Sequence, residues 1–176
     1  ENGQLQATLD NYGIHRYTGS DYVGSLLAMD KDIAKKMLRS AGVLTADWIM
    51  LRDASAASAD KAEREIDYPC VIKPNSCGSS VGVSIVNNRE ELERALSDAF
   101  AWESMIMCEK LVSGREMTVG ILDGEVLPAI EIIPNEGFYD YKNKYQAGKT
   151  TELCPAPITD AEYADMADAT RRGFDA

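Results

Sequence analysis

A lysine and a run of small residues stand together within residues 69–84, and their types could bind an anion. Lys73 brings a positive charge, and Ser79 and Ser80 bring hydroxyl groups between two glycines. Glycine lets the backbone approach a ligand closely, and successive N–H groups in such a turn can form an anion-binding concavity. The stretch therefore predicts a grip on phosphate.

The residues alone leave a simpler alternative open, which is an ordinary glycine hairpin with a solvated lysine. Two familiar nucleotide-binding loops do not fit. The Walker pattern places its lysine directly after the last glycine, whereas Lys73 precedes the glycines. A Rossmann G-x-G-x-x-G turn opening a helix is absent. The phosphate hypothesis thus depends on the order strand, lysine, small-residue loop, strand.

The elements that must position this loop are short strands. Apolar runs predict strands at Cys70–Ile72 and Val83–Val86, and Pro74, which has no N–H, is expected to end the first of them. Further strands are expected at 48–51 and 105–110. Asp123-Gly124 predicts a two-residue hairpin between strands at 117–122 and 125–133 of one antiparallel sheet, and 14–17 is also strand-like.

Apolar residues at helical spacing predict the helices. The expected helices are 4–12, 30–41, 54–66, 88 or 89 to about 101, and 160 to about 174. On the second of them, the simplest interpretation of Lys31, Lys35, Lys36 and Arg39 is a solvated basic face.

The Lys73 stretch, in its order of strand, Lys-Pro, glycine–serine hairpin and strand, resembles the ATP-grasp superfamily. The string Lys73-Pro-Asn-Ser-Cys-Gly-Ser-Ser-Val-Gly-Val closely resembles the D-alanine–D-alanine ligases of cell-wall synthesis. Other similar strings follow the same order and cover essentially the whole chain. The resemblance implies an α+β fold of the ATP-grasp kind, with antiparallel sheet and flanking helices.

The string Glu109-Lys-Leu-Val112-Ser-Gly-Arg-Glu116 carries the next part of the resemblance. Without it, both glutamates would be interpreted as surface carboxylates at strand ends. The resemblance implies that Glu109, with the backbone at Lys110 and Val112, reads adenine. It also implies that Glu116 accepts hydrogen bonds from ribose hydroxyls, a role that suits a carboxylate. Met29-Asp30-Lys31 matches a lysine that contacts ATP phosphate.

Residues 135–154 form a long, polar, tyrosine-rich stretch, whose aromatic content argues against plain disorder. Its Phe-Tyr-Asp-Tyr…Lys-Tyr string resembles a mobile loop that closes on the reaction. The resemblance implies that Lys144 reaches phosphate and that Tyr145 bonds to Ser79, in a triad with a glutamate before Glu1. For this segment alone we expect residues 135–148 to be mobile or displaced, with Tyr145 away from Ser79. The reason is that ordering costs roughly 1–2 kcal/mol per backbone residue.

The function implied is ATP-dependent D-alanine–D-alanine ligation for peptidoglycan synthesis, through an acyl phosphate. The implied small molecules are ATP, D-alanine and Mg²⁺, with the metal ligands expected beyond Ala176, so no metal-binding residue is named. The implied protein is a cytoplasmic homodimer, and this segment alone is expected to be inactive. Two alternatives remain, namely another ATP-grasp carboxylate–amine ligase, for example D-Ala–D-Ser, or a non-catalytic nucleotide-binding fragment.

The expected domains are the tail of an N-terminal substrate-binding domain at 1–28 and a nucleotide-binding subdomain at 29–134. Residues 135–176 would hold the active-site loop and the start of a C-terminal subdomain.

Composition excludes several classes of function. The chain has 18 basic and 29 acidic residues and a net charge of −11, which argues against a nucleic-acid partner. No apolar run is long enough to span a bilayer. The four cysteines form no C-x-x-C pair and His15 is the only histidine, so a zinc site is not expected and a reducing compartment is favoured.

Overall fold

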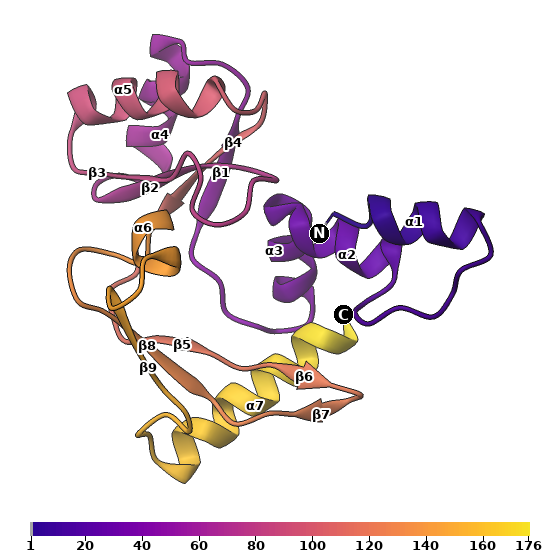
Figure 1. Ribbon diagram of the computed structural model, residues 1–176. Coiled ribbons are helices and arrows are strands. Elements are labelled where there is room, and N and C mark those ends of the chain that lie inside the picture. The colour runs from indigo at the N-terminus through magenta and orange to yellow at the C-terminus, as the bar shows by residue number, and fades with distance from the viewer. Residues whose placement is uncertain (1) are drawn as a thin grey trace.

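The computed structural model describes residues 2–176, which form an α+β structure (Figure 1). These residues contain seven helices and nine strands, and every strand pairing is antiparallel. Glu1, where the predicted N-terminal domain tail begins, lies outside the described residues. None of the helices in the described part of the chain is long and apolar enough to cross a membrane.

A four-stranded sheet forms the centre of the upper part of the molecule in Figure 1, in the order β1-β4-β2-β3. Its strands are β1 (Trp48–Leu51), β4 (Ile106–Lys110), β2 (Cys70–Pro74) and β3 (Ser84–Val86). All four strand predictions are confirmed to within one or two residues at their ends. The strand β2 ends at Pro74 as expected, because proline has no N–H to continue the ladder.

The helices α4 (Ala56–Glu65) and α5 (Arg89–Phe100) cover one face of this sheet (Figure 1). Burial alternates along β2: Cys70, Ile72 and Pro74 are buried, whereas the intervening Val71 and Lys73 are only half-buried. Since successive side chains of a strand point to opposite faces, packing of the buried set against α4 and α5 directs Lys73 away from the core. The apolar pattern of the strand therefore fixes where the charge lies.

A second, three-stranded sheet has the order β5-β8-β9, with β5 (Glu116–Thr118), β8 (Ile130–Pro134) and β9 (Thr150–Leu153). The helix α7 (Asp160–Asp175) contacts the hairpin that follows β5 in the chain (Figure 1). The strands β6 (Ile121–Leu122) and β7 (Glu125–Val126) make a separate hairpin. At its tip Asp123 and Gly124 have φ of +50° and +78°, as the two-residue turn requires.

The prediction of two long strands at 117–122 and 125–133 in one sheet is therefore wrong. Each is split into two strands, and the halves belong to different sheets. Pro128 stands at the break between β7 and β8, where it cannot donate to a ladder. The strand β9 was not predicted, because its sequence lies in the long polar stretch and shows no apolar run.

Three helices, α1 (Gln4–Asn11), α2 (Tyr22–Met29) and α3 (Lys31–Ser40), form the N-terminal part. The sequence predicts α1 and α3 but not α2, whose apolar residues are too continuous to show a helical stripe. Residues 14–17 are not a strand in the structure, since no neighbouring strand pairs with them. The Asp30 carboxylate caps α3 by accepting a hydrogen bond from the Ile33 N–H at 2.9 Å, so the helix begins directly after it.

Candidate functional site

A cavity of about 580 Å³ lies where the start of α3, the glycine–serine loop and the end of β4 meet. Its walls come from segments far apart in the sequence. Eight of the residues singled out in the sequence line it: Lys31, Lys73, Ser79, Ser80, Glu109, Lys110, Val112 and Lys144. Glu116 does not, because it lies exposed on β5.

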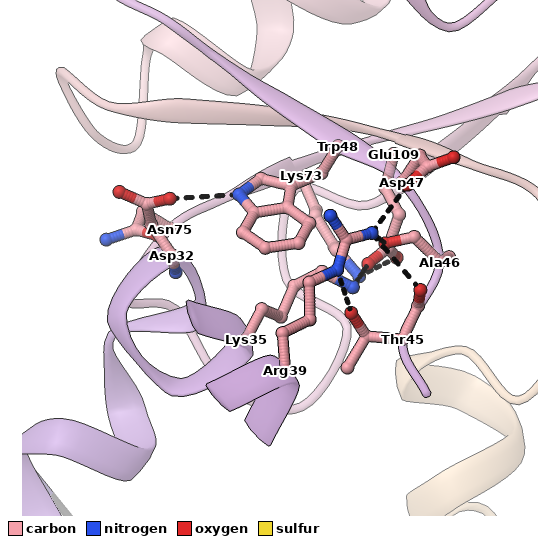
Figure 2. Close-up of polar contacts among 10 residues, drawn as sticks. All are labelled: Asp32, Lys35, Arg39, Thr45, Ala46, Asp47, Trp48, Lys73, Asn75 and Glu109. Carbon is pink, nitrogen blue, oxygen red and sulfur yellow. Dashed lines mark hydrogen bonds and ion pairs between the residues drawn. The ribbon is translucent and has the colours of Figure 1, made fainter. Parts of the chain in front are cut away.

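The carboxylate of Glu109 is held by two lysines, Lys35 from α3 and Lys73 from β2 (Figure 2). Each ammonium binds a different carboxylate oxygen. The three side chains are only 12–20% exposed. Burial raises the pKa of Glu109, but the hydrogen bonds from the two lysines outweigh it, so the pKa of Glu109 is lowered overall. The site thus holds a buried anion between two cations.

Lys35 is a residue of this site that the sequence interpretation assigned to a solvated face. It is four positions after Lys31, so the two share a helix face, and both line the cavity. That spacing was the one available signal. Its partner Glu109 is 74 positions away, and no local pattern shows such a contact.

Lys31 is bound to the loop that follows β2. Its ammonium donates hydrogen bonds to the carbonyl oxygens of Asn75, at 3.0 Å, and Cys77, at 2.6 Å. The buried Asn75 side chain also accepts from the Asp32 N–H at 3.0 Å. Burial, and then the nearby charge of Lys73, lower the pKa of Lys31. The start of α3 is therefore fixed against the loop, with its lysine facing the cavity.

Trp48 is a residue of β1 that the sequence interpretation did not single out, and its ring lies beside α3 (Figure 2). Its indole N–H donates to the Asp32 carboxylate at 2.9 Å. The Lys35 ammonium lies 4.8 Å, and the Arg39 guanidinium 4.4 Å, from the centre of its ring. Trp48 is also the cross-strand partner of Glu109 in the β1–β4 ladder. The ring thus restricts where the Lys35 side chain can lie.

The tyrosine-rich stretch contains one more helix, α6 (Tyr141–Tyr145), which sequence reasoning did not predict. The Asp140 carboxylate caps it by accepting from the Asn143 N–H at 2.8 Å. The buried side-chain amide of Asn143 donates to the carbonyl oxygens of Glu136, at 2.8 Å, and Phe138, at 2.6 Å. The stretch is therefore held in shape by its own hydrogen bonds.

This stretch is closed onto the glycine–serine loop. The Tyr145 and Ser79 hydroxyls lie 2.7 Å apart, and the Ser80 hydroxyl donates to the Tyr139 carbonyl at 3.0 Å. The expectation that Tyr145 lies away from Ser79 in this segment is wrong. The internal hydrogen bonds of Asn143 help to offset the entropic cost of ordering the stretch. Closure also brings Lys144 to the cavity.

The backbone of the glycine–serine loop is unusual. Ser79 and Ser80 have φ of +53° and +59°, a conformation that non-glycine residues seldom adopt and that recurs at functional sites. Gly82 has φ of +69°, and a Cβ there would lie 2.8 Å from the Pro74 ring. Glycine is therefore required for the loop to fold back against the end of β2.

The family resemblance implies magnesium, which in proteins is bound mainly by carboxylate oxygens. Within residues 2–176 no three His, Cys, Asp or Glu side chains gather closely enough to hold a metal ion. Among the described residues that line the cavity, Glu109 is the only carboxylate, and it is paired with two lysines. These residues do not make a magnesium centre.

Comparisons with known proteins agree on one family. The family described as "D-ala D-ala ligase C-terminus" matches residues 37–176. The D-alanine–D-alanine ligase of Syntrophotalea carbinolica is 40% identical over the whole of this chain, which covers 56% of that protein.

Two solved structures are also similar. The D-alanine–D-alanine ligase of Bacillus anthracis complexed with ATP aligns with a TM-score of 0.78 and 36% identity, over 99% of this chain and 56% of that one. The VanG D-Ala:D-Ser ligase of Enterococcus faecalis aligns with a TM-score of 0.87 and 29% identity, over 99% and 52%.

The chain spans about half the length of the curated relatives that it matches. The match to the family nevertheless covers most of the chain, and the likeness extends to the three-dimensional fold. The resemblance seen in the Lys73 and Glu109 strings is thereby confirmed, and with it the ATP-grasp kind of α+β fold. The chain belongs to the D-alanine–D-alanine ligase family, and its residues 37–176 correspond to the part described as the C-terminus.

Proposed function

We propose that this chain supplies the nucleotide-binding part of an ATP-dependent D-alanine–D-alanine ligase for peptidoglycan synthesis. The family supports the reaction class, and the relatives that carry the name are about twice as long as this chain. The activity is accordingly proposed for the whole protein, of which this chain forms a part.

The observation that carries the proposal is the distribution of charge around the cavity. Lys31, Lys73 and Lys144 come from three separate elements, α3, β2 and α6, and all line one space. Clustered lysines repel one another, so an arrangement of this kind suits a polyanion that neutralises them. A nucleoside triphosphate has that charge.

We assign the two ends of the nucleotide to the two ends of the cavity. The lysines, with Ser79 and Ser80, would bind the phosphates. Glu109 would accept a hydrogen bond from the adenine amino group, and the backbone at Lys110 and Val112 would pair with the ring edge. Glu116, exposed on β5, is proposed for the ribose hydroxyls on the strength of the family resemblance alone.

The proposed chemistry has two steps. A carboxylate oxygen of one D-alanine attacks the terminal phosphorus of ATP, the bond to the β-phosphate oxygen breaks, and ADP leaves. The amine of a second D-alanine then attacks the acyl phosphate, loses a proton, and displaces inorganic phosphate as the amide bond forms. The lysines of this chain would act by positioning the phosphates and offsetting their charge. The Tyr145–Ser79 bond would hold Lys144 at the reacting phosphate.

The family resemblance supports further parts of the proposal. We place the protein in the cytoplasm, as a homodimer, with residues 29–134 as its nucleotide-binding subdomain. The same resemblance implies Mg²⁺, but the described residues offer no cluster for it, and no step above is assigned to a metal.

A second candidate is a D-Ala–D-Ser ligase. This candidate is supported by the structural likeness of the chain to the VanG D-Ala:D-Ser ligase, which has a TM-score of 0.87. Both candidates use the same nucleotide chemistry and differ only in the second amino acid.

The test measures phosphate release and dipeptide formation by the whole protein with ATP, D-alanine and either D-alanine or D-serine. We expect D-Ala–D-Ala as the main product, and a Lys73→Ala variant serves as the control for contaminating activity. A main product of D-Ala–D-Ser would move the assignment to the second candidate. Nucleotide binding without either product would instead favour a non-catalytic role.

A further inference from the structure

Both carboxylate oxygens of Glu109, the side chain proposed to read the base, are bonded to lysines. One oxygen accepts from Lys35 and the other from Lys73. If Glu109 had a single lysine beside it, the carboxylate would lose its counter-charge once phosphate attracted that lysine. With two lysines, one can turn to phosphate while the other still neutralises the carboxylate.

We propose that Lys35 is a positioning residue that keeps Glu109 charged and oriented for the base while Lys73 turns to phosphate. This inference rests on the proposed nucleotide site and adds a residue to it. Lys35 acts through Glu109 and has no role in the chemical step.

The surroundings of the two lysines support different roles for them, with Lys73 binding phosphate and Lys35 holding Glu109. Lys73 stands on β2 next to Pro74, just before the glycine–serine loop, and it lines the same cavity as Ser79 and Ser80 of that loop. Lys35 is instead confined between α3 and the ring of Trp48, with its ammonium 4.8 Å from the ring centre. Of the two cations, Lys35 is the one that the protein holds in place.

Burial strengthens the interaction between Lys35 and Glu109. The side chains of Lys35 and Glu109 are 12% and 13% exposed, so water screens their interaction poorly. Removing one partner of a buried pair leaves an uncompensated charge, which is costly. A carboxyl without Lys35 would protonate more readily or turn toward solvent once Lys73 had moved. Either change removes the acceptor that the base needs.

The state of the Glu109 carboxylate should also affect the selectivity between ATP and GTP. The exocyclic amine of adenine donates to a carboxylate, whereas guanine presents a carbonyl oxygen at the equivalent ring position and is repelled by it. A fixed, charged Glu109 therefore favours ATP over GTP. Loss of Lys35 should weaken ATP binding more than GTP binding and so reduce the preference between them.

The experiment compares Lys35→Met with Lys36→Met by isothermal titration of this chain with ATP and with GTP. Lys36 is the next residue of α3, and its 65%-exposed side chain pairs with Asp32 and does not line the cavity. Its loss therefore removes the same charge outside the cavity. We expect Lys35→Met to weaken ATP binding about tenfold, the range for a lost charge-assisted hydrogen bond, and to lower the ATP-to-GTP preference. Lys36→Met should change neither quantity by more than about twofold.

Two further variants separate this role from a general effect on folding. Lys35→Arg keeps the charge and should retain most of the preference for ATP. In a Glu109→Gln background the carboxylate is gone, so adding Lys35→Met should lower the preference no further. Thermal melts of all variants check that each chain folds cooperatively. If Lys35→Met alone fails to fold, the Lys35→Arg and double-variant comparisons decide.

The outcomes distinguish two failures. Equal weakening of ATP and GTP by Lys35→Met, or an additive loss in the double variant, would overturn the role of Lys35 while leaving the nucleotide site intact. No binding of either nucleotide by the unmodified chain would remove the proposed site, and this inference with it.

Discussion

The hydroxyl groups of Tyr145 and Ser79 lie 2.7 Å apart although 66 positions separate them in the sequence. One belongs to α6 and the other to the glycine–serine loop after β2. This hydrogen bond, together with the one from the Ser80 hydroxyl to the Tyr139 carbonyl, joins the two segments proposed to surround the phosphates.

Replacing Tyr145 by phenylalanine tests this bond. The side chain of Tyr145 is 64% exposed, so the loss of its hydroxyl should leave the melting temperature nearly unchanged. Turnover of the whole protein should fall, because Lys144 would be held less firmly at the cavity. Steady-state kinetics and a thermal melt measure both effects. A fully active Phe variant would count against the role of the bond.

Lys73→Ala should weaken ATP binding or turnover at least tenfold, since a lost charge-assisted hydrogen bond costs about 1.5–3 kcal/mol. Lys61 of α4 does not line the cavity, and Lys61→Ala removes an equal charge as a control. Titration with ATP gives the affinity directly. Unchanged kinetic constants for ATP in the Lys73 variant would contradict the assignment of this lysine.

Glu109 predicts a pH dependence of stability. Its pKa is lowered in the folded chain, so the carboxylate stabilises the fold above its unfolded-state pKa, and this contribution is lost as the pH falls through the folded value. The free energy of unfolding should therefore decrease as the pH drops below about 4.5, the ordinary pKa of glutamate. Urea titrations at several pH values measure it.

Glu109→Gln should be less stable than the unmodified chain at neutral pH, because two partly buried lysines lose their counter-ion. The free energy of unfolding of this variant should also change less between pH 5 and pH 3, because the variant lacks one carboxyl group that takes up a proton in that range. An unaltered pH profile in this variant would show that the group contributes nothing to the acid response.

Asn143→Ala should loosen the tyrosine-rich stretch. The substitution leaves the carbonyl oxygens of Glu136 and Phe138 without their donor, at a cost of roughly 1–3 kcal/mol locally. Amide hydrogen exchange across residues 136–150 should become faster. Asn87→Ala removes a side chain that bonds to Glu91 at an exposed position and should leave that exchange unchanged. Equal protection in both variants would contradict the role of Asn143.

Local patterns account for the part of the fold that the sequence predicted. The starts of α3, α5 and α7 follow from capping side chains at Asp30, Asn88 and Thr159, each of which bonds to an N–H three residues later. The strands of the four-stranded sheet follow from short apolar runs. These signals are complete within a few residues, so they can be interpreted without knowing the rest of the chain.

The missed features depend on contacts between distant residues. Lys35 resembles its exposed neighbour Lys36 in sequence, and only the packing of α3 beside β4 makes one of them a partner of Glu109. The closure of α6 was missed for a related reason, because the two bonds donated by the Asn143 amide appear only after the stretch has folded. Helix α2 gave no periodic signal at all.

The chain passes from the four-stranded to the three-stranded sheet once, through residues 111–115, and this passage borders the cavity. The bonds from Ser79 and Ser80 to the tyrosine-rich stretch join the same two sheets a second time. The two sheets are therefore linked in two ways beside the cavity. The peptide chain at residues 111–115 is a permanent link, whereas the two hydrogen bonds can break and re-form. Loss of the two serine hydroxyls would remove these hydrogen bonds and leave residues 111–115 as the covalent link between the two sheets, so one wall of the cavity would become easier to open.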